Sequence, residues 1–226
     1  MPNPLSRVRP DKVPLHIMAG GLAQRPELAK HVMSVIDWWS YSEAQLAALL
    51  PRFLKADYRV THAMFQALSS AEARRSALTA AARATMSSEE FELYESVMRA
   101  IVPTRNTRNA FAHRLWCISE SLPEALLLTD GSWEAEQSII VKELVAKAMT
   151  DPQASVVPPE TDYSRFMVYR ENDLLREVEA AKRAFFLIYR FSKCLGDPSW
   201  QRDAWRAELS SELASAQTQG SPTPPG

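Results

Sequence analysis

The chain has 226 residues, with 26 Lys and Arg against 27 Asp and Glu. This length predicts one domain with a sizeable apolar core. The nearly balanced charge excludes a general electrostatic attraction to polyanions, so any nucleic-acid binding must depend on a local cationic patch.

Cysteine usage and hydropathy exclude several further classes of protein. Cys117 and Cys194 lie far apart, without a CxxC pair or clustered histidines, so we predict neither a disulfide framework nor a metal site. No apolar run approaches the roughly 20 residues that cross a bilayer, and residues 1–21 lack the apolar stretch of a secretory signal. We therefore expect a cytoplasmic protein with no membrane-spanning segment and no cofactor.

Both ends of the chain are rich in proline. We predict a flexible N-terminal tail over residues 1–20 and a C-terminal segment over residues 201–226 that ends in a disordered, proline-rich tail. Between them Ala, Leu, Glu and Arg dominate and glycine is scarce, as is typical of packed helices. The sequence thus predicts an all-α fold with a single helical domain over residues 21–200.

Apolar residues spaced by three and four predict the helices of this domain in chain order. The first covers about residues 26–54, with a possible interruption near Ser40. The second begins after Asp57. The third and fourth open with the capping patterns of residues 69–72 and 87–90, in which a serine hydroxyl and a glutamate satisfy free backbone amides.

The helical pattern weakens from residue 117 to residue 170. Prolines and the Asp-Gly pair at 130–131 separate short apolar runs here. Two of these runs, residues 126–128 and 166–169, can pair as a small sheet. The last strong helix follows Asn172, so we predict a small irregular, β-containing insertion before it, over about residues 117–170.

One segment of the chain is strongly cationic. Between Glu95 and Glu120 the sequence has no acidic residue, although the whole chain is balanced in charge. Such a patch suits phosphate groups, because guanidinium groups are planar and permanently charged. The alternative is an ordinary solvated helix face. The basic residues of this segment are Arg99, Arg105, Arg108, His113 and Arg114.

Two of these arginines continue an apolar helical stripe. Steps of four and three from Ile101 lead to Arg105 and Arg108, at positions that face a core. A buried unpaired charge is very costly, so Arg108 should meet a carboxylate, an anionic ligand or a wet cleft between subunits. Pro103 removes one helix hydrogen bond and predicts a kink just before Arg108.

Residues 108–113 are Arg-Asn-Ala-Phe-Ala-His. This segment resembles the motif of the HEPN superfamily, in which an arginine, followed by a polar residue, precedes a histidine by a few residues. The resemblance implies a helical bundle with the motif late in a long helix, and a homodimer that brings two motifs together. It further implies metal-independent cleavage of RNA by a toxin or defence-type protein, with Arg108, Asn109 and His113 as catalytic residues.

The chemistry of these side chains fits such a reaction without reference to a family. His113 can exchange a proton near neutral pH, as the reaction of a ribose 2′-hydroxyl requires, and Arg108 can stabilise charge on the phosphate oxygens. Asn109 lies four residues before His113 on the same helix face and can orient the imidazole. The predicted RNA phosphate contacts are Arg105, Arg114 and Arg99.

Glu43 is a candidate carboxylate partner for Arg108. If the first helix is continuous, Glu43 lies on its apolar stripe with Trp39 and Leu46 and faces the core. If residues 40–43 instead form a capping box, Glu43 only caps a new helix. The sequence leaves both alternatives open.

Two functions remain compatible with the sequence. One is a HEPN-like, metal-independent endoribonuclease that acts on RNA as a homodimer. The alternative is a non-catalytic HEPN-like helical module in which Arg108 and His113 hold a dimer interface or bind an anionic ligand or protein partner. Trp38, Trp39 and Trp116 are predicted as core or dimer-interface aromatics, because they lie among aliphatic residues at helical spacing.

Overall fold

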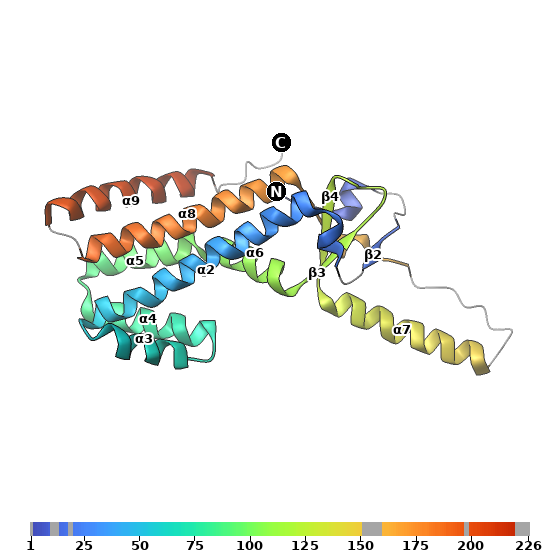
Figure 1. The fold of residues 1–226 in the computed structure, drawn as a ribbon, viewed down its shortest axis with the longest axis horizontal. Coiled ribbons are helices and arrows are strands. Elements are labelled where there is room, and N and C mark those ends of the chain that lie inside the picture. Colours follow the sequence, from blue (N-terminus) through green and yellow to red (C-terminus); the bar gives the residue numbers. More distant parts are fainter. Residues whose placement is uncertain (1, 10–13, 18–19, 151–159, 197–198, 220–226) are drawn as a thin grey trace. The chain divides into compact units, whose positions relative to one another are not determined.

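The fold is mostly α-helical with one small antiparallel β-sheet (Figure 1). The predicted combination of a helical fold with a small β-containing part is therefore confirmed. The computed structural model describes residues 2–9, 14–17, 20–150, 160–196 and 199–219.

The chain divides into two compact units rather than the single domain predicted over residues 21–200. Unit 1 comprises Met1–Ser34 and Asn109–Val178, and unit 2 comprises Val35–Arg108 and Glu179–Gly226. Each unit contains residues from distant parts of the sequence. The division is not visible in the sequence, because three continuous helices contribute residues to both units.

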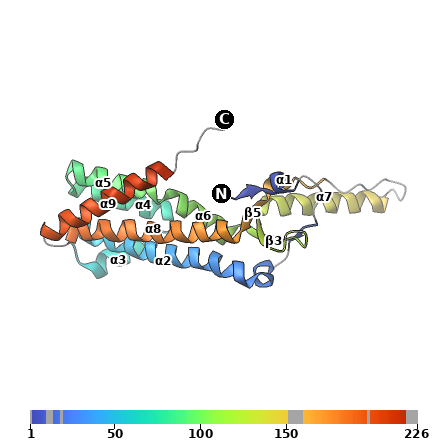
Figure 2. The same cartoon turned by 90° about the horizontal axis from the view of Figure 1, so that it is seen from above.

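Unit 2 is built from helices, several of which run side by side in both views (Figures 1 and 2). The capping box predicted at residues 87–90 forms, whereas at residues 69–72 Ser70 alone caps α4 (Ala71–Thr85), and its hydroxyl accepts a hydrogen bond from the Ala73 amide at 3.0 Å. The Asp57 carboxylate accepts a hydrogen bond from the Val60 amide at 3.1 Å, and Ser87 and Glu90 form a reciprocal capping box. The helices of unit 2 are α2 (Pro26–Leu54), α3 (Tyr58–Ala67), α4 (Ala71–Thr85), α5 (Ser88–Ala100), α6 (Val102–His113), α8 (Glu171–Gly196) and α9 (Ser199–Gln219), of which α2, α6 and α8 begin or end in unit 1.

Helix α2 is continuous through Ser40. The Ser40 hydroxyl donates a hydrogen bond to the Ile36 carbonyl at 3.0 Å, as a serine within a helix does. The possible interruption near Ser40 is therefore wrong, and so is the alternative in which Glu43 belongs to a capping box.

The cationic segment spans a break between two helices. α5 ends at Ala100 and α6 begins at Val102, with Ile101 between them at φ −87° and ψ −10°. Pro103 lies in the first turn of α6, where an amide has no partner within the helix and its loss costs little. The predicted bend is confirmed, while the single long helix expected to carry the motif is two shorter ones.

The core of unit 2 centres on three nearly fully buried rings. Phe53, Tyr94 and Phe191 contact one another with ring centroids 5.8 to 6.5 Å apart. The Tyr94 hydroxyl lies 3.1 Å from the Thr79 hydroxyl, which satisfies its polar end inside the core. Burial raises the pKa of Tyr94. These contacts join α2, α4, α5 and α8 into one bundle.

The sheet lies wholly within unit 1 and has the strand order β1-β5-β4-β3-β2, with all neighbours antiparallel. The predicted pairing of two apolar runs is confirmed, because Leu126 pairs with Tyr169 and Leu128 with Met167. Every residue of β4 is buried. The strands are β1 (Asn3–Pro4), β2 (His16–Ile17), β3 (Leu115–Ile118), β4 (Ala125–Thr129) and β5 (Met167–Arg170).

The N-terminal residues belong to this sheet. β1 pairs with β5, and Leu5 at the start of α1 (Leu5–Val8) is 0 % exposed and donates its amide to the Phe166 carbonyl at 2.7 Å. The prediction of a flexible tail over residues 1–20 is therefore wrong for the described part of that segment. Pro4 is compatible with a strand because β1 lies at the edge of the sheet.

Two further features of the chain differ from the predicted elements. Helix α7 (Gly131–Thr150) lies where an irregular insertion was predicted, and no residue of it is buried. The short 3-10 helices η1 (Gly21–Gln24) and η2 (Tyr163–Arg165) precede α2 and β5. The proline-rich run at residues 220–226 lies outside the described residues.

Removal of the Phe191 ring should destabilise unit 2 strongly. Phe191 is 1 % exposed, and Phe→Ala at such sites costs about 3–5 kcal/mol through lost burial and a cavity. We expect Phe191→Ala to lower the free energy of unfolding in urea by this amount. Met64→Ala, at a side chain that is 62 % exposed, is the matched control and should change it by less than about 0.5 kcal/mol. Equal losses in the two variants would contradict the assigned core.

Candidate functional site

The predicted motif lies on α6, with His113 as the last residue of the helix. His113 and Asn109 are both exposed, one helical turn apart on the same face. The arrangement leaves an imidazole open to solvent beside a side-chain amide.

Arg108 is only half-buried, and its Nε atom is buried. Arg108 and Asn109 both interact with other residues of the protein. The guanidinium is therefore part of the fold while keeping partial access to solvent. This position agrees with the prediction that Arg108 is not a simple surface charge.

The end of α6 is fixed by a cluster of three aromatic side chains in unit 1. The Phe111 ring is 3 % exposed and contacts the rings of Trp116 and Tyr169 edge-on, with centroids 5.1 and 5.2 Å away. The Trp116 indole also donates a hydrogen bond to the Phe111 carbonyl at 3.1 Å. Burial raises the pKa of Tyr169 to about 12. Trp116 is thus confirmed as a packing residue. Phe111, two positions before His113, is held in place by these contacts.

The three predicted phosphate contacts differ in exposure. Arg99 and Arg114 are exposed, whereas Arg105 is half-buried. The pKa of Glu72 is lowered mainly by its hydrogen bond to Arg75, and the charge of Arg105 adds to this effect. The segment that lacks acidic residues in the sequence therefore has a carboxylate near it in space, and Arg99 and Arg114 are its more accessible cations.

Glu43 is exposed and accepts a hydrogen bond from the indole of Trp39 at 3.0 Å. Trp39 itself is 2 % exposed and belongs to the core of unit 2. A buried indole N–H needs an acceptor, so the Glu43 carboxylate has a structural role within α2. Glu43 does not face the core as the apolar stripe had predicted.

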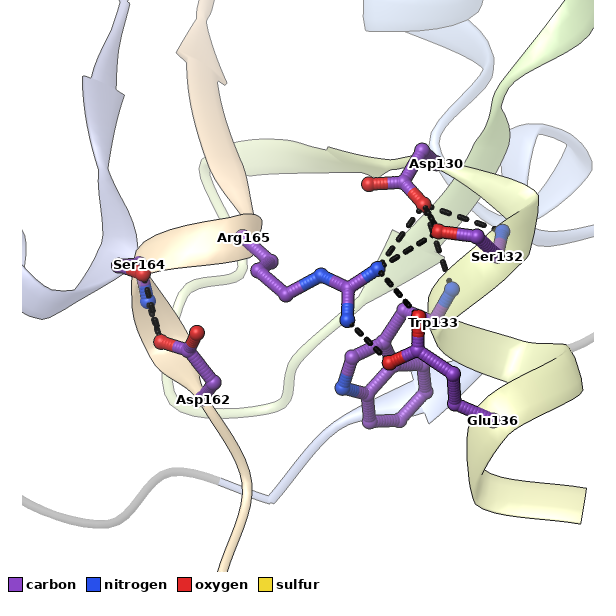
Figure 3. A network of polar contacts seen from close by, with 7 residues as sticks. All are labelled: Asp130, Ser132, Trp133, Glu136, Asp162, Ser164 and Arg165. Carbon is purple, nitrogen blue, oxygen red and sulfur yellow. Dashed lines mark hydrogen bonds and ion pairs between the residues drawn. The ribbon is translucent and has the colours of Figure 1, made fainter. Parts of the chain in front are cut away.

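Sequence reasoning missed a polar network at the start of α7 (Figure 3). The Asp130 carboxylate accepts hydrogen bonds from the amides of Ser132 and Trp133 at 3.0 and 3.2 Å, as a helix N-cap does. The guanidinium of Arg165 reaches Asp130 at 3.1 Å, the Ser132 hydroxyl at 2.7 Å and Glu136 at 2.5 Å. The Asp-Gly pair was predicted only as a turn, because the partner Arg165 is distant in the sequence.

This network is a structural clamp rather than a reactive centre. Arg165 joins the η2 segment to α7, because its guanidinium pairs with both Glu136 and Asp130. The hydrogen bond from Ser132 is the main cause that lowers the pKa of Asp130 to about 2, followed by the Trp133 amide and Arg165. Trp133 then packs edge-on against Phe166, with ring centroids 5.0 Å apart.

A patch of aromatic rings lies on α2 and α8 of unit 2. Tyr41 is 56 % exposed and Phe186 is 41 % exposed, while Trp38, Phe185 and Tyr189 are half-buried beside them. The rings contact one another, with the Trp38 and Phe185 centroids 5.5 Å apart and those of Phe185 and Phe186 5.2 Å apart. We call these five residues the aromatic patch.

Metal-binding clusters and membrane-spanning helices are both absent from the residues that the structure describes. No group of three or more His, Cys, Asp and Glu side chains there is placed to hold a metal ion. No helix in the same ranges is both long and apolar enough to cross a bilayer. Cys117 is buried in unit 1, which raises its thiol pKa to about 12 and makes it unsuited to nucleophilic chemistry.

No protein-family model, no curated protein and no solved structure matches this chain.

The clamp at α7 predicts a pH-dependent stability. The pKa of Asp130 is about 2 in the folded protein against 3.8 ordinarily, so its contribution is present above pH 3.8 and is lost as the pH falls through 2. Asp130→Ala should remove the helix cap at neutral pH, at a cost of about 1 kcal/mol in urea unfolding. The difference from the wild-type protein should shrink as the pH approaches 2.

Asp130→Asn is the matched variant, because asparagine keeps the cap but cannot titrate. We expect it to be more stable than Asp130→Ala at pH 7 and to lose this part of the pH dependence. A wild-type advantage over Asp130→Ala that stays constant down to pH 2 would rule out the assigned role of the Asp130 charge.

Proposed function

We propose that this protein is a metal-independent endoribonuclease resembling the HEPN superfamily, with Arg108, Asn109 and His113 as its catalytic residues. The observation that carries the proposal is the exposed imidazole of His113 at the end of α6, on the helix face of Asn109 and on the same helix as Arg108. These three side chains provide a titratable group, an orienting amide and a permanent cation.

The proposed reaction is a transfer within the RNA chain. His113 removes the proton of a ribose 2′-hydroxyl, and the 2′-oxygen then forms a bond to the adjacent phosphorus. The bond from phosphorus to the 5′-oxygen breaks, and that oxygen takes a proton from a second imidazole. Arg108 stabilises the negative charge on the phosphate oxygens throughout. The products are a 2′,3′-cyclic phosphate and a 5′-hydroxyl.

A second imidazole requires a second copy of the chain. Within the motif His113 is the single histidine, so a homodimer is the simplest source of a separate acid and base. Rigid support also favours catalysis, since the Phe111 cluster holds the end of α6 without covering His113. Arg99 and Arg114 are exposed, as side chains that contact RNA phosphates must be.

The aromatic patch is the surface that we assign to self-association. Exposed aromatic rings with cations at their edge are typical of the centre of protein interfaces. The Arg190 guanidinium lies 5.6 Å from the ring centroid of Phe186, and the Lys193 ammonium lies 5.6 Å from the ring centroid of Tyr189. These two ring faces are therefore occupied by cations rather than open to bases. The exposed, acidic Asp37 adjoins Trp38 in α2 and would repel a phosphate, so we assign the patch to a second copy of the chain rather than to an RNA strand.

A non-catalytic module is the second candidate function. It is favoured by one observation, namely that Arg108 is half-buried and, like Asn109, interacts with other residues of the fold. In that case the motif stabilises the junction of α6 with the sheet and binds an anionic ligand or a protein partner. The two candidates make opposite demands on His113, since only catalysis needs its imidazole.

Cleavage of RNA should depend on His113. We expect purified protein to cleave a labelled single-stranded RNA in EDTA, and His113→Ala to lower the rate by about 100-fold or more, as loss of a general base does. Arg108→Lys should lower it by about the same factor, since lysine cannot reproduce the planar contact to phosphate. The rate and the 2′,3′-cyclic phosphate ends of the products are the measurements.

His16→Ala, at another exposed histidine of unit 1, is the matched control and should retain full activity. It is prepared in the same way, so a contaminating nuclease would give equal rates in all variants. Equal cleavage by His113→Ala and His16→Ala would sink the proposal. Loss of stability in Arg108→Lys without any cleavage by the wild-type protein would favour the non-catalytic module.

The homodimer is tested separately by light scattering after size exclusion. We expect the wild-type mass to be twice that of the chain, and Tyr41→Asp combined with Phe186→Asp to shift it to the monomer, because two charges would be buried unpaired. Tyr58→Asp on α3, at a ring that is 54 % exposed, is the control and should leave the dimer intact. A monomeric wild-type protein at all concentrations would contradict the assignment of the patch.

A further inference from the structure

A pocket of about 460 Å³ lies within unit 1, away from the residues assigned to catalysis. Three segments line it: residues 24–28 at the start of α2, residues 123–124 before β4, and residues 170–172 at the start of α8. These segments are far apart in the sequence, so the pocket exists only in the folded unit. Its volume lies in the range of sites that bind small molecules.

The pocket is lined by three glutamates, and each of them has a basic side chain beside it. Glu27 forms an ion pair with Lys30, which lowers the pKa of Glu27. Glu124 lies 3.5 Å from the guanidinium of Arg170, and Glu171 lies 3.5 Å from the imidazole of His31. The carboxylates in the pocket wall are thus largely compensated by their own neighbours.

Arg25 is the lining cation without such a neighbour. Its Nη1 atom donates to the backbone carbonyl of Gln24 at 3.2 Å, and no carboxylate in the described ranges pairs with the guanidinium. Its Nε atom is buried and has no hydrogen-bond acceptor among the residues that the structure describes. Because this Nε atom is closed to solvent, an acceptor supplied from outside the chain can approach only the rest of the half-buried guanidinium.

The ends of two helices add to the positive potential of the pocket. α2 begins at Pro26 and α8 at Glu171, and residues of both first turns belong to the lining. The positive end of a helix dipole favours an anion nearby. Among the charged residues of the lining, Arg25 is the cation that has no carboxylate paired with it in the described ranges, so an anionic group would meet its positive charge there.

We propose that this pocket binds a small anionic metabolite, whose carboxylate or phosphate group pairs with Arg25. The volume exceeds that of a single carboxylate or phosphate group, so the anionic group belongs to a larger molecule. Hydroxyl or amino groups on that molecule donate hydrogen bonds to Glu124 and Glu171, which retain free acceptor positions because each carboxylate has two oxygens. The ligand class is thus a hydroxylated or aminated small anion, such as a sugar phosphate or a sugar acid.

This inference does not depend on the ribonuclease proposal. Ribose 5-phosphate, gluconate and neutral ribose are the probes, and isothermal titration calorimetry of the full chain is the measurement. We expect at least one of the two anions to bind, with ribose binding at least tenfold more weakly. Tighter binding of ribose 5-phosphate would indicate a preference for a phosphate group, and tighter binding of gluconate a preference for a carboxylate.

Arg25→Gln should weaken binding of the anion at least tenfold and leave the melting temperature within a few degrees of the wild-type value. Arg25→Lys should give an intermediate affinity, because lysine keeps the charge but loses the planar contact. Arg7→Gln, at an exposed arginine of the same unit outside the pocket, should bind as the wild-type protein does.

Three results would overturn the inference. These are binding of neither anion at millimolar concentration, equal affinity for ribose and the anions, and equal losses of affinity in Arg25→Gln and Arg7→Gln. None of these results involves RNA cleavage, so a failure here and a failure of the ribonuclease proposal can be distinguished.

Discussion

The buried ring of Phe111 is the contact on which the position of the motif depends. It is locked against Trp116 and Tyr169, which belong to β3 and β5, and its carbonyl is held by the Trp116 indole. Since Phe111 lies between Asn109 and His113, these two exposed side chains extend from a fixed helix end. The chain thus combines an apolar anchor with polar neighbours that are exposed to solvent. Such a combination is what a site needs when its side chains must be accessible but not mobile.

Local compensation of charge is the second constraint on the structure. Four ion pairs join residues that are three positions apart on one helix, such as Glu72 with Arg75. These exposed pairs contribute little to stability individually. Arg25 is noteworthy because its half-buried guanidinium has a buried Nε atom that lacks an acceptor in the described ranges.

Features that depend on neighbours in the sequence could be predicted, and features that depend on distant partners could not. The cap at Asp57, the capping box of Ser87 and Glu90, and the break before Pro103 follow from a few adjacent residues, and all three are present. The pairing of β1 with β5 joins residues more than 150 positions apart, and the prolines near it suggested a tail instead. Similarly, α7 was missed because its start depends on Arg165 as well as on Asp130, and because no buried face gives it a clear apolar period.

The same distinction applies to the two candidate sites. The motif on α6 is contiguous, so its residues could be named from the sequence, although the exposure of His113 and the half-burial of Arg108 required the fold. The pocket around Arg25 combines three distant segments, none of which has a recognisable pattern, and it could be found only in three dimensions.

Strand β5 connects these two parts of unit 1. Tyr169 contacts Phe111, whereas the next residue, Arg170, lines the pocket and pairs with Glu124. Successive residues of a strand point to opposite faces of the sheet, so the anchor of the motif and the wall of the pocket extend from opposite sides of one strand. A substitution of either side chain can therefore leave the other face packed as before. A shift of the strand backbone, in contrast, would move both together.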